Sequence, residues 1–356
     1  MGQGLAFGMK IAIVGASGHG YTTIKGAKHY PDVTGDIVGI APGSPGESIS
    51  AITGYLEREG YQPGVFDHWQ EMLVQCEPDI VVVNPHFFDH EQVALAVISA
   101  GRHLFVEKPL ALTLRGFEKI RSAYQASSVE LAAMLNMRYE PAMRTAWKAI
   151  QVGRIGEVRS LHVQKSYKLG TRPDFYKHRS TSGGLIPWVG CHGIDMIAFL
   201  SGKAFLNVNA ASSAKNNRSH GDLETSASMF FRLSDEIIAT AQVDYFRPES
   251  ASGHDDDRAR VVGTKGIIEV RHGKCLLLSD DDGLGDHGAL DFAEHSEASA
   301  VELPLERPAS LFADFMAQCA GVGVCDITAE ESLENTRVSL LTRAAADTGQ
   351  QVALSD

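Results

Sequence analysis

Residues 10–20 read KIAIVGASGHG, an unbroken apolar run that ends in a glycine-rich turn. A run without polar alternation is typical of a strand buried on both faces of a parallel sheet. Gly15 and Gly20 hold the first and last places of a G-x-G-x-x-G turn, where glycine permits a tight turn and close helix packing; Ser17 stands in the second place, with Gly18 beside it. The helix that follows would offer N–H groups and a partial positive charge to a pyrophosphate. The segment therefore predicts a dinucleotide-binding turn.

Three further apolar runs repeat the strand pattern, at residues 36–40, 79–83 and 103–106. Helical stretches lie between them, and the clearest begins at Asp89, with Gln92 as its capping partner, and ends at Gly101. Alternating strands and helices predict an α/β Rossmann domain with a doubly wound parallel sheet. We place this domain at residues 1–137, and residues 1–8 are expected to be a loose leader and not a signal peptide.

Polar or glycine-containing segments follow three of these strands. Such sheets bind their ligands at the carboxyl ends of the strands, so these segments are expected to meet at one edge. The predicted cofactor-binding residues are Gly15, Ser17, Gly18, His19, Gly20, Ser44, Asn84, Pro85, His86, Glu107 and Lys108.

The residue that would read the ribose of the dinucleotide is not evident. An NAD site usually has Asp or Glu about 20 residues after the glycine turn, at the end of the second strand. Here that strand ends in residues 40–44, Ile-Ala-Pro-Gly-Ser, which include neither a carboxylate nor an arginine for a 2′-phosphate. NAD and NADP both stay open as the cofactor.

The second half, residues 138–356, is expected to be an α+β domain for substrate binding and oligomerisation, with a large, mostly antiparallel open sheet. Apolar residues alternate with polar ones from Ala227 to Leu233, and the chain returns from Ile237 to Tyr245. Residues 258–278 predict two more strands around two glycine turns. Helices close the chain, and Thr328 with Glu331 predicts a capping box for the last one.

Composition narrows the class of protein. The net charge of −12, without a run of Lys or Arg, disfavours nucleic acid as a partner. No apolar run reaches the roughly 18 residues of a membrane span. The five scattered cysteines indicate reduced thiols in a cytoplasmic protein. The acidic stretches 255–257 and 280–282 lack the alternate ligand spacing of a calcium loop, so we expect solvated loops and no metal site.

Several motifs together resemble the glucose–fructose oxidoreductase / inositol dehydrogenase / rhizopine catabolism (Gfo/Idh/MocA) family over nearly the whole chain. They are residues 10–20, Glu107-Lys108-Pro109 after residues 100–103, Arg138-Tyr139-Glu140-Pro141, residues 153–158, Gly183-Gly184 with His192 and Asp195, and residues 311–354. The resemblance implies an NAD(P)-dependent oxidoreductase acting on a sugar, cyclitol or related polyol. It also implies that the open sheet face pairs two subunits, in a homodimer or homotetramer.

Lys108 and His192 are the predicted catalytic residues. A cationic amine at a strand end can stabilise negative charge on the reacting oxygen, and an imidazole can take or give the substrate proton. Trp188, Asp195 and Tyr167 are the predicted substrate-binding residues. Asp195 has two open roles, to orient His192 or to anchor its helix locally.

Trp188 departs from the resemblance, because the family commonly has Asp at this position, four residues before the histidine. The indole cannot transfer a proton, but it can stack on a sugar ring. Two alternatives to a dehydrogenase or reductase therefore stay open. One is a cofactor-binding regulator without turnover, and the other is a lyase or glycosidase that uses bound NAD transiently.

Overall fold

The computed structural model describes residues 7–28, 33–254, 256–279 and 300–355, which form parts of two compact units. Unit 1 comprises Met1–Asn136, Pro173–Trp188 and Ser310–Leu340, and unit 2 comprises Met137–Arg172, Val189–Ala309 and Leu341–Asp356. The first border between the units, after Asn136, lies one residue from the domain border that the sequence predicts after residue 137. Two later segments of the chain return to unit 1, which the sequence patterns did not indicate. Residues 1–6 of the predicted leader, Asp255 and residues 280–282 lie outside the described residues.

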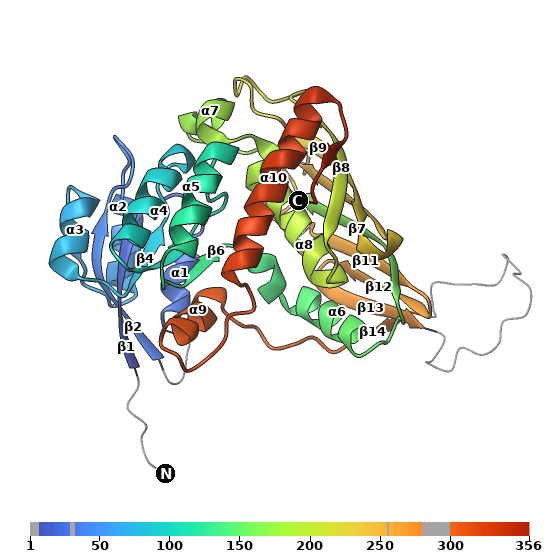
Figure 1. Cartoon of the computed structure of the whole chain (residues 1–356), viewed down its shortest axis with the longest axis horizontal. Helices are drawn as coiled ribbons and strands as arrows, with labels where there is room; N and C mark the ends of the chain where they lie inside the picture. The colour runs from blue at the N-terminus through green and yellow to red at the C-terminus, as the bar shows by residue number, and fades with distance from the viewer. Residues whose placement is uncertain (1–6, 29–32, 255, 280–299, 356) are drawn as a thin grey trace, which may run out of the picture. The chain divides into compact units, whose positions relative to one another are not determined.

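Unit 1 is built on a parallel sheet that, within its described residues, has six strands in the order β3-β2-β1-β4-β5-β6 (Figure 1). The strands are β1 (Phe7–Val14), β2 (Val33–Ala41), β3 (Gly64–Val65), β4 (Ile80–Val83), β5 (His103–Val106) and β6 (Leu131–Ala133). This confirms the predicted Rossmann class and its four apolar runs. The very short strands β3 and β6 were not predicted.

The helices of unit 1 are α1 (Gly20–Gly26), α2 (Ser50–Arg58), α3 (Trp69–Cys76), α4 (His90–Ser99), α5 (Leu114–Gln125), α7 (Arg179–Ser182), α9 (Leu311–Cys319) and the first part of α10 (Ala329–Thr348). The predicted start of α4 is confirmed, because Asp89 is its N-cap residue, but the predicted capping bond is absent: Asp89 has helical dihedral angles at the end of a 3₁₀ turn, and its side chain makes no capping bond. The capping box of α10 is confirmed, because Thr328 and Glu331 exchange bonds of 3.0 and 3.1 Å.

The strand order indicates where unit 1 would bind its cofactor. Strands β1 and β4 are neighbours, with Val14 opposite Val83, and the sheet is wound outward from this pair in both directions. The carboxyl ends of such a central pair leave a crevice in which α/β sheets bind ligands. The glycine turn after β1 and the segment after β4 therefore begin at this crevice.

Unit 2 is built on a sheet that, in the part of the chain the structure describes, has nine strands in the order β14-β13-β12-β11-β7-β10-β9-β8-β15. They are β7 (Val158–Ser166), β8 (Phe205–Ser213), β9 (Ser226–Leu233), β10 (Ile238–Asp244), β11 (Arg258–Gly263), β12 (Gly266–Arg271), β13 (Lys274–Ser279), β14 (Val301–Glu302) and β15 (Val352–Ala353). All pairs are antiparallel except β7 with β10, which confirms the mostly antiparallel sheet. The fully described stretch 258–279 holds three strands, where two were predicted.

Helices α6 (Pro141–Gln151) and α8 (Cys191–Ser201) pack on this sheet, α6 on β12 and β13 and α8 on β7 and β10 (Figure 1). Successive side chains of a strand point to opposite faces of the sheet. On β9, Met229 and Phe231 are therefore buried, whereas Phe230 between them is 39% exposed. Phe230 lines an open depression of about 490 Å³ together with polar side chains of β7, β8 and β10.

One stretch of the described residues, 179–201, is long and apolar enough to cross a membrane by length and composition alone. In its most apolar window 89% is buried inside the protein, so length and composition alone are weak evidence for a membrane span here.

Candidate cofactor and active site

The turn after β1 strongly favours glycine at two positions. Gly15 has φ +86°, and a Cβ there would lie 2.4 Å from the main chain of Asn84 and Pro85. Gly18 has φ +74°, and its Cβ would lie 2.2 Å from the Glu107 carboxylate. Both values of φ fall in the left-handed region that favours glycine. The turn is therefore pressed against the segments that follow β4 and β5.

Hydrogen bonds join the predicted cofactor-binding segments. The main-chain N–H of Ser17 donates to the Asn84 carbonyl oxygen at 2.7 Å. The main-chain N–H of His86 donates to the Ser44 hydroxyl at 2.9 Å. The structure thus brings the segments after β1, β2 and β4 to one edge of the sheet.

Glu107 is the buried centre of this edge. Its Oε2 accepts the main-chain N–H of His19 at 2.7 Å and lies 2.8 Å from the His19 ring nitrogen Nδ1. Its Oε1 accepts the main-chain N–H of Lys108 at 3.0 Å. Burial alone would raise the pKa of Glu107, but the charges of His19 and Lys108 and the bonds from His19 outweigh it and lower the pKa to about 2. Glu107 is therefore a carboxylate that ties β5 to the start of α1.

Glu47 was missed by the sequence reading. Its carboxylate accepts bonds from the main-chain N–H groups of Ala16, Gly43 and Ser44. The signal was present, because Ser44-Pro45-Gly46-Glu47 has Pro and Gly at the central positions of a type II turn, which folds the fourth residue back on the first. The Glu47 N–H does donate to the Ser44 carbonyl oxygen, at 3.1 Å.

These residues fit a dinucleotide. The buried Asn84 side chain points its Nδ2 group toward Gly20 and makes no hydrogen bond with this group to any described residue. The first N–H groups of α1 have no partner within the helix. An unused buried donor and a helix start beside a glycine turn suit a polar, anionic ligand.

Lys108 follows β5 in a Lys108–Pro109 segment with a cis peptide bond, and it is 2% exposed. Its ammonium group donates to the Trp188 carbonyl oxygen at 3.1 Å and lies 3.1 Å from the centre of the Trp188 ring. It also lies 3.7 Å from Oε1 of Glu107. A buried cation is thus held by a carbonyl dipole, an aromatic face and a carboxylate.

Trp188 lies in an aromatic cluster of unit 1 and is 8% exposed. Phe87 stacks on it with ring centres 4.3 Å apart, and Tyr176 meets it edge-on at 5.7 Å. Phe175 contacts both Phe87 and Tyr176. In this conformation the indole offers little surface to a sugar, because Phe87 and the Lys108 ammonium group contact its face.

His192 and Asp195 lie on α8 in unit 2, and each is 1% exposed. Oδ1 of Asp195 accepts two bonds from Arg138, at 2.9 Å from Nε and 2.8 Å from Nη2. Arg138 was quoted in the resemblance without a role. The pair joins Asp195 to a segment distant in the chain, and both predicted roles of Asp195 stay predictions.

Tyr167 lies just beyond β7 and is 9% exposed. The Lys165 ammonium group lies 4.9 Å from the centre of its ring and binds Asp257 at 2.7 Å. Neither Lys165 nor this pairing was predicted.

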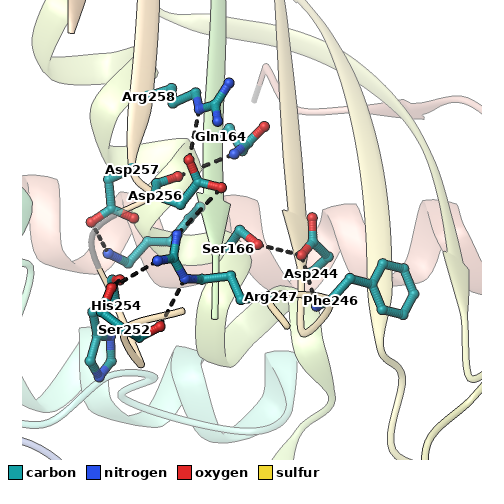
Figure 2. A network of polar contacts seen from close by, with 11 residues as sticks. Gln164, Ser166, Asp244, Phe246, Arg247, Ser252, His254, Asp256, Asp257 and Arg258 are labelled. Carbon is teal, nitrogen blue, oxygen red and sulfur yellow. Dashed lines mark hydrogen bonds and ion pairs between the residues drawn. The ribbon is translucent and has the colours of Figure 1, made fainter. Parts of the chain in front are cut away.

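Figure 2 shows the loop between β10 and β11, which contacts Lys165 through Asp257. Asp256 binds Arg258 at 2.7 Å and Arg247 at 3.5 Å, while Arg247 also donates to Ser252. The described acidic residues of the 255–257 stretch are thus bound to cationic side chains. No group of three potential metal ligands occurs among the described residues.

Two family models match the chain. Residues 9–134 match the model described as an oxidoreductase family with an NAD-binding Rossmann fold, and residues 143–269 match the GFO/IDH/MocA C-terminal domain.

Individual proteins are similar as well. A solved structure of a putative oxidoreductase from Thermotoga maritima is 40% identical, with a TM-score of 0.88 over 97% of this chain and 100% of that one. Inositol 2-dehydrogenase of Rhizobium meliloti is 23% identical over 74% of this chain and 81% of its own length. Levoglucosan dehydrogenase in complex with NADH shares the fold, at 16% identity and a TM-score of 0.79 over 98% of this chain and all of that one.

The chain spans 57% and 39% of the length of two other curated relatives. The two family models and the 40% identical structure cover both units. This chain therefore belongs to the Gfo/Idh/MocA family of oxidoreductases with an NAD-binding Rossmann fold.

Proposed function

We propose that this protein is an NAD(P)-dependent dehydrogenase or reductase that acts on a hydroxyl or carbonyl group of a sugar, cyclitol or related polyol. The observation that carries the proposal is the buried Lys108 ammonium group at the carboxyl end of β5. Its contacts with Glu107 and Trp188 fix it beside the edge where the segments of the cofactor site meet. A fixed cation in a site of low dielectric stabilises charge far better than a cation in water.

Lys108 is proposed to hydrogen-bond the reacting oxygen of the substrate. The ammonium group carries a positive charge and N–H donors, and its bond to the Trp188 carbonyl oxygen fixes its position. Negative charge grows on the substrate oxygen as a hydroxyl proton leaves, and an ammonium group already fixed beside that oxygen would stabilise the charge without reorganisation. NAD(P), when bound, supplies the hydride acceptor or donor.

His192 is proposed to take or give the substrate proton, since imidazole changes its charge near neutral pH. Its position on α8 is supported by the neighbouring pair of Asp195 and Arg138, which holds that turn of the helix. Asp195 and Tyr167 remain proposed substrate-binding residues.

The proposed substrate class is supported by the names of relatives, an inositol 2-dehydrogenase and a levoglucosan dehydrogenase. Both names refer to compounds with several hydroxyl groups. The screen described below identifies which polyol this protein uses.

One observation favours a second candidate, a cofactor-binding regulator without turnover. The position that commonly carries Asp in the family is Trp188 here, and its ring contacts the Lys108 ammonium group face-on. A ring that stayed in this place would limit access to the amine. The two candidates differ in whether cofactor is consumed.

We further propose that the protein is cytoplasmic and forms a homodimer or homotetramer. The structure describes all five cysteines, and none is in a disulfide bond, which suits a reducing compartment. Phe230 and Ile238 are 39% and 45% exposed on the sheet of unit 2, which suits contact with a second copy of the same face.

The test is a screen of cyclitols, sugars and their oxidised forms with NAD and NADP, followed by absorbance of the reduced cofactor. Steady turnover with at least one polyol supports the proposal. Binding of cofactor without turnover of any compound supports the regulator. Release of a sugar without net change in NADH would instead indicate a lyase or glycosidase.

Lys108→Met is the matched variant for this screen. It keeps the length and apolar stem of the side chain but removes the charge. We expect kcat to fall by about 10²-fold or more, the scale of a positioned electrostatic or acid–base group, with cofactor affinity nearly unchanged. A variant with normal turnover would remove Lys108 from the mechanism.

A further inference from the structure

The Glu47 carboxylate receives four hydrogen bonds from two separate loops. On Oε1 it accepts the main-chain N–H of Ala16 at 2.9 Å and the Ser17 hydroxyl at 3.3 Å. On Oε2 it accepts the main-chain N–H groups of Gly43 and Ser44 at 2.9 and 3.1 Å. Two donors come from the turn after β1 and two from the loop after β2, so the carboxylate bridges these loops.

This bridge lies at a defined place in the sheet. Strands β1 and β2 are adjacent and parallel, and their last residues, Val14 and Ala41, are opposite each other. In dinucleotide-binding sheets an acidic residue at the end of the second strand reads the 2′ position of the adenosine ribose. Residues 41–44 lack such a residue, but the turn at residues 44–47 brings the Glu47 side chain back to the same strand end.

The four bonds on Glu47 are not equivalent. Three donors are main-chain N–H groups, which hold the carboxylate in place. The fourth is the Ser17 hydroxyl, whose bond is the longest and whose side chain can rotate away. A ribose hydroxyl can therefore take the place of the Ser17 hydroxyl, whereas the other three positions stay filled.

Charge at this point favours a ribose without phosphate. A 2′-phosphate carries roughly −1.5 to −2 charges near pH 7 and has little to donate to a carboxylate. Residues 41–57 include no lysine or arginine that could neutralise it. Like charges brought together at a binding site weaken binding.

We infer that Glu47 is the ribose-reading residue of this protein and that it selects NAD(H) over NADP(H). Ser17, in the place of the second motif glycine, shields the carboxylate until the ribose hydroxyl replaces it. The inference rests on the dinucleotide binding within the proposed function, and it requires no turnover.

The experiment measures dissociation constants of NADH and NADPH, by quenching of protein fluorescence, on the full chain without substrate. The wild-type protein should bind NADH about 100-fold more tightly than NADPH, since each 1.4 kcal/mol is tenfold in affinity. Glu47→Gln should reduce that ratio about tenfold or more, because the amide removes the charge. Glu57→Gln, the same change at an exposed position of α2, should leave the ratio unchanged.

The ratio of the two constants separates recognition from a merely structural role. If Glu47 only joins the two loops, Glu47→Gln weakens both cofactors equally and the ratio stays constant, which overturns the inference. A wild-type ratio near or below one overturns it too. Partial unfolding of the variant cancels in the ratio, because both constants come from one preparation. Failure of the polyol screen leaves this measurement intact, whereas a protein that binds neither cofactor overturns both proposals.

Discussion

Trp188 contacts Lys108 in two ways, through its main-chain oxygen and through its ring. The oxygen is present whichever residue stands at position 188. The attraction of the ring face for a cation needs an aromatic side chain. Substitutions of Trp188 therefore separate a contact of the backbone from a contact of the indole.

Replacing Trp188 by Leu removes the aromatic face, while Trp188→Phe keeps one. We expect kcat of Trp188→Leu to fall about tenfold with KM little changed, because a desolvated cation–π contact is worth about 1–2 kcal/mol and acts through the reacting group. Trp188→Phe should stay within about threefold of wild type. Steady-state kinetics on the best polyol of the screen provide both constants.

The opposite pattern has a clear meaning. If KM of Trp188→Leu rises while kcat holds, the indole binds the sugar itself, since such contacts stabilise ground and transition states alike. The ring would then have to leave Phe87, on which it stacks at 4.3 Å.

Single residues could be predicted from the sequence where a short motif contains them. Lys108 follows from Glu107-Lys108-Pro109 at a strand end. The contacts of Lys108 with Trp188, and of Asp195 with Arg138, could not be predicted, because each joins segments distant in the chain. Glu47 is an intermediate case, since its turn is local but its partners Ala16 and Ser17 are not.

At the scale of elements, Glu107 joins β5 to the start of α1 through His19. Its pKa is about 2 in the folded protein, below the ordinary value of 4.5. A depressed carboxyl pKa contributes stability above pH 4.5, and this contribution is lost as the pH falls toward 2, because the unfolded chain takes up the proton first. We expect the thermal midpoint to fall steeply between about pH 4.5 and pH 3.

Glu107→Gln isolates this contribution, because the amide does not titrate. Its midpoint should be lower than that of wild type at pH 7, and its acid decline should be shallower. Glu57→Gln, at an exposed site, should follow the wild-type curve. Parallel curves for Glu107→Gln and wild type would show that the acid response arises elsewhere.

Helices and strands could be predicted where their sequence patterns are local and span enough residues. The four longer strands of unit 1 have continuous apolar runs, whereas β3 and β6, of two and three residues, have too few residues for a pattern. The two capping motifs differ for a physical reason. Thr328 lies before the first turn of its helix and makes the capping bond, whereas Asp89, the N-cap residue of α4, is also the last residue of a 3₁₀ turn, and its side chain makes no capping bond.

At the scale of the whole molecule, the open sheet face of unit 2 leads to a prediction about assembly. If a second copy covers Phe230, Phe230→Glu places an unpaired charge in the interface, which costs several kcal/mol. We expect wild type to sediment as a dimer or tetramer at micromolar concentration and Phe230→Glu as a monomer. The variant should keep its NADH affinity, because Phe230 lies on β9 of unit 2.

Val324→Glu is the matched control, since Val324 is 79% exposed and belongs to unit 1. It should sediment like the wild-type protein. A wild-type protein that sediments only as a monomer would show that the sheet face needs no partner.

Unit 1 is not continuous in sequence, and this affects when the unit can complete its fold during synthesis. Helix α9 packs with α1 and contacts β2 and β5, and the Ser332 hydroxyl accepts the N–H of Ala133 on β6 at 3.0 Å. These four contacts join the first 136 residues to residues translated after residue 309. The surface of the Rossmann sheet that α9 covers in the folded protein is therefore exposed until most of unit 2 has been synthesised. During that interval we expect apolar side chains such as Phe105, which pack against Phe312 and Phe315 of α9 in the folded protein, to stay exposed and to favour binding of chaperones that recognise apolar surface.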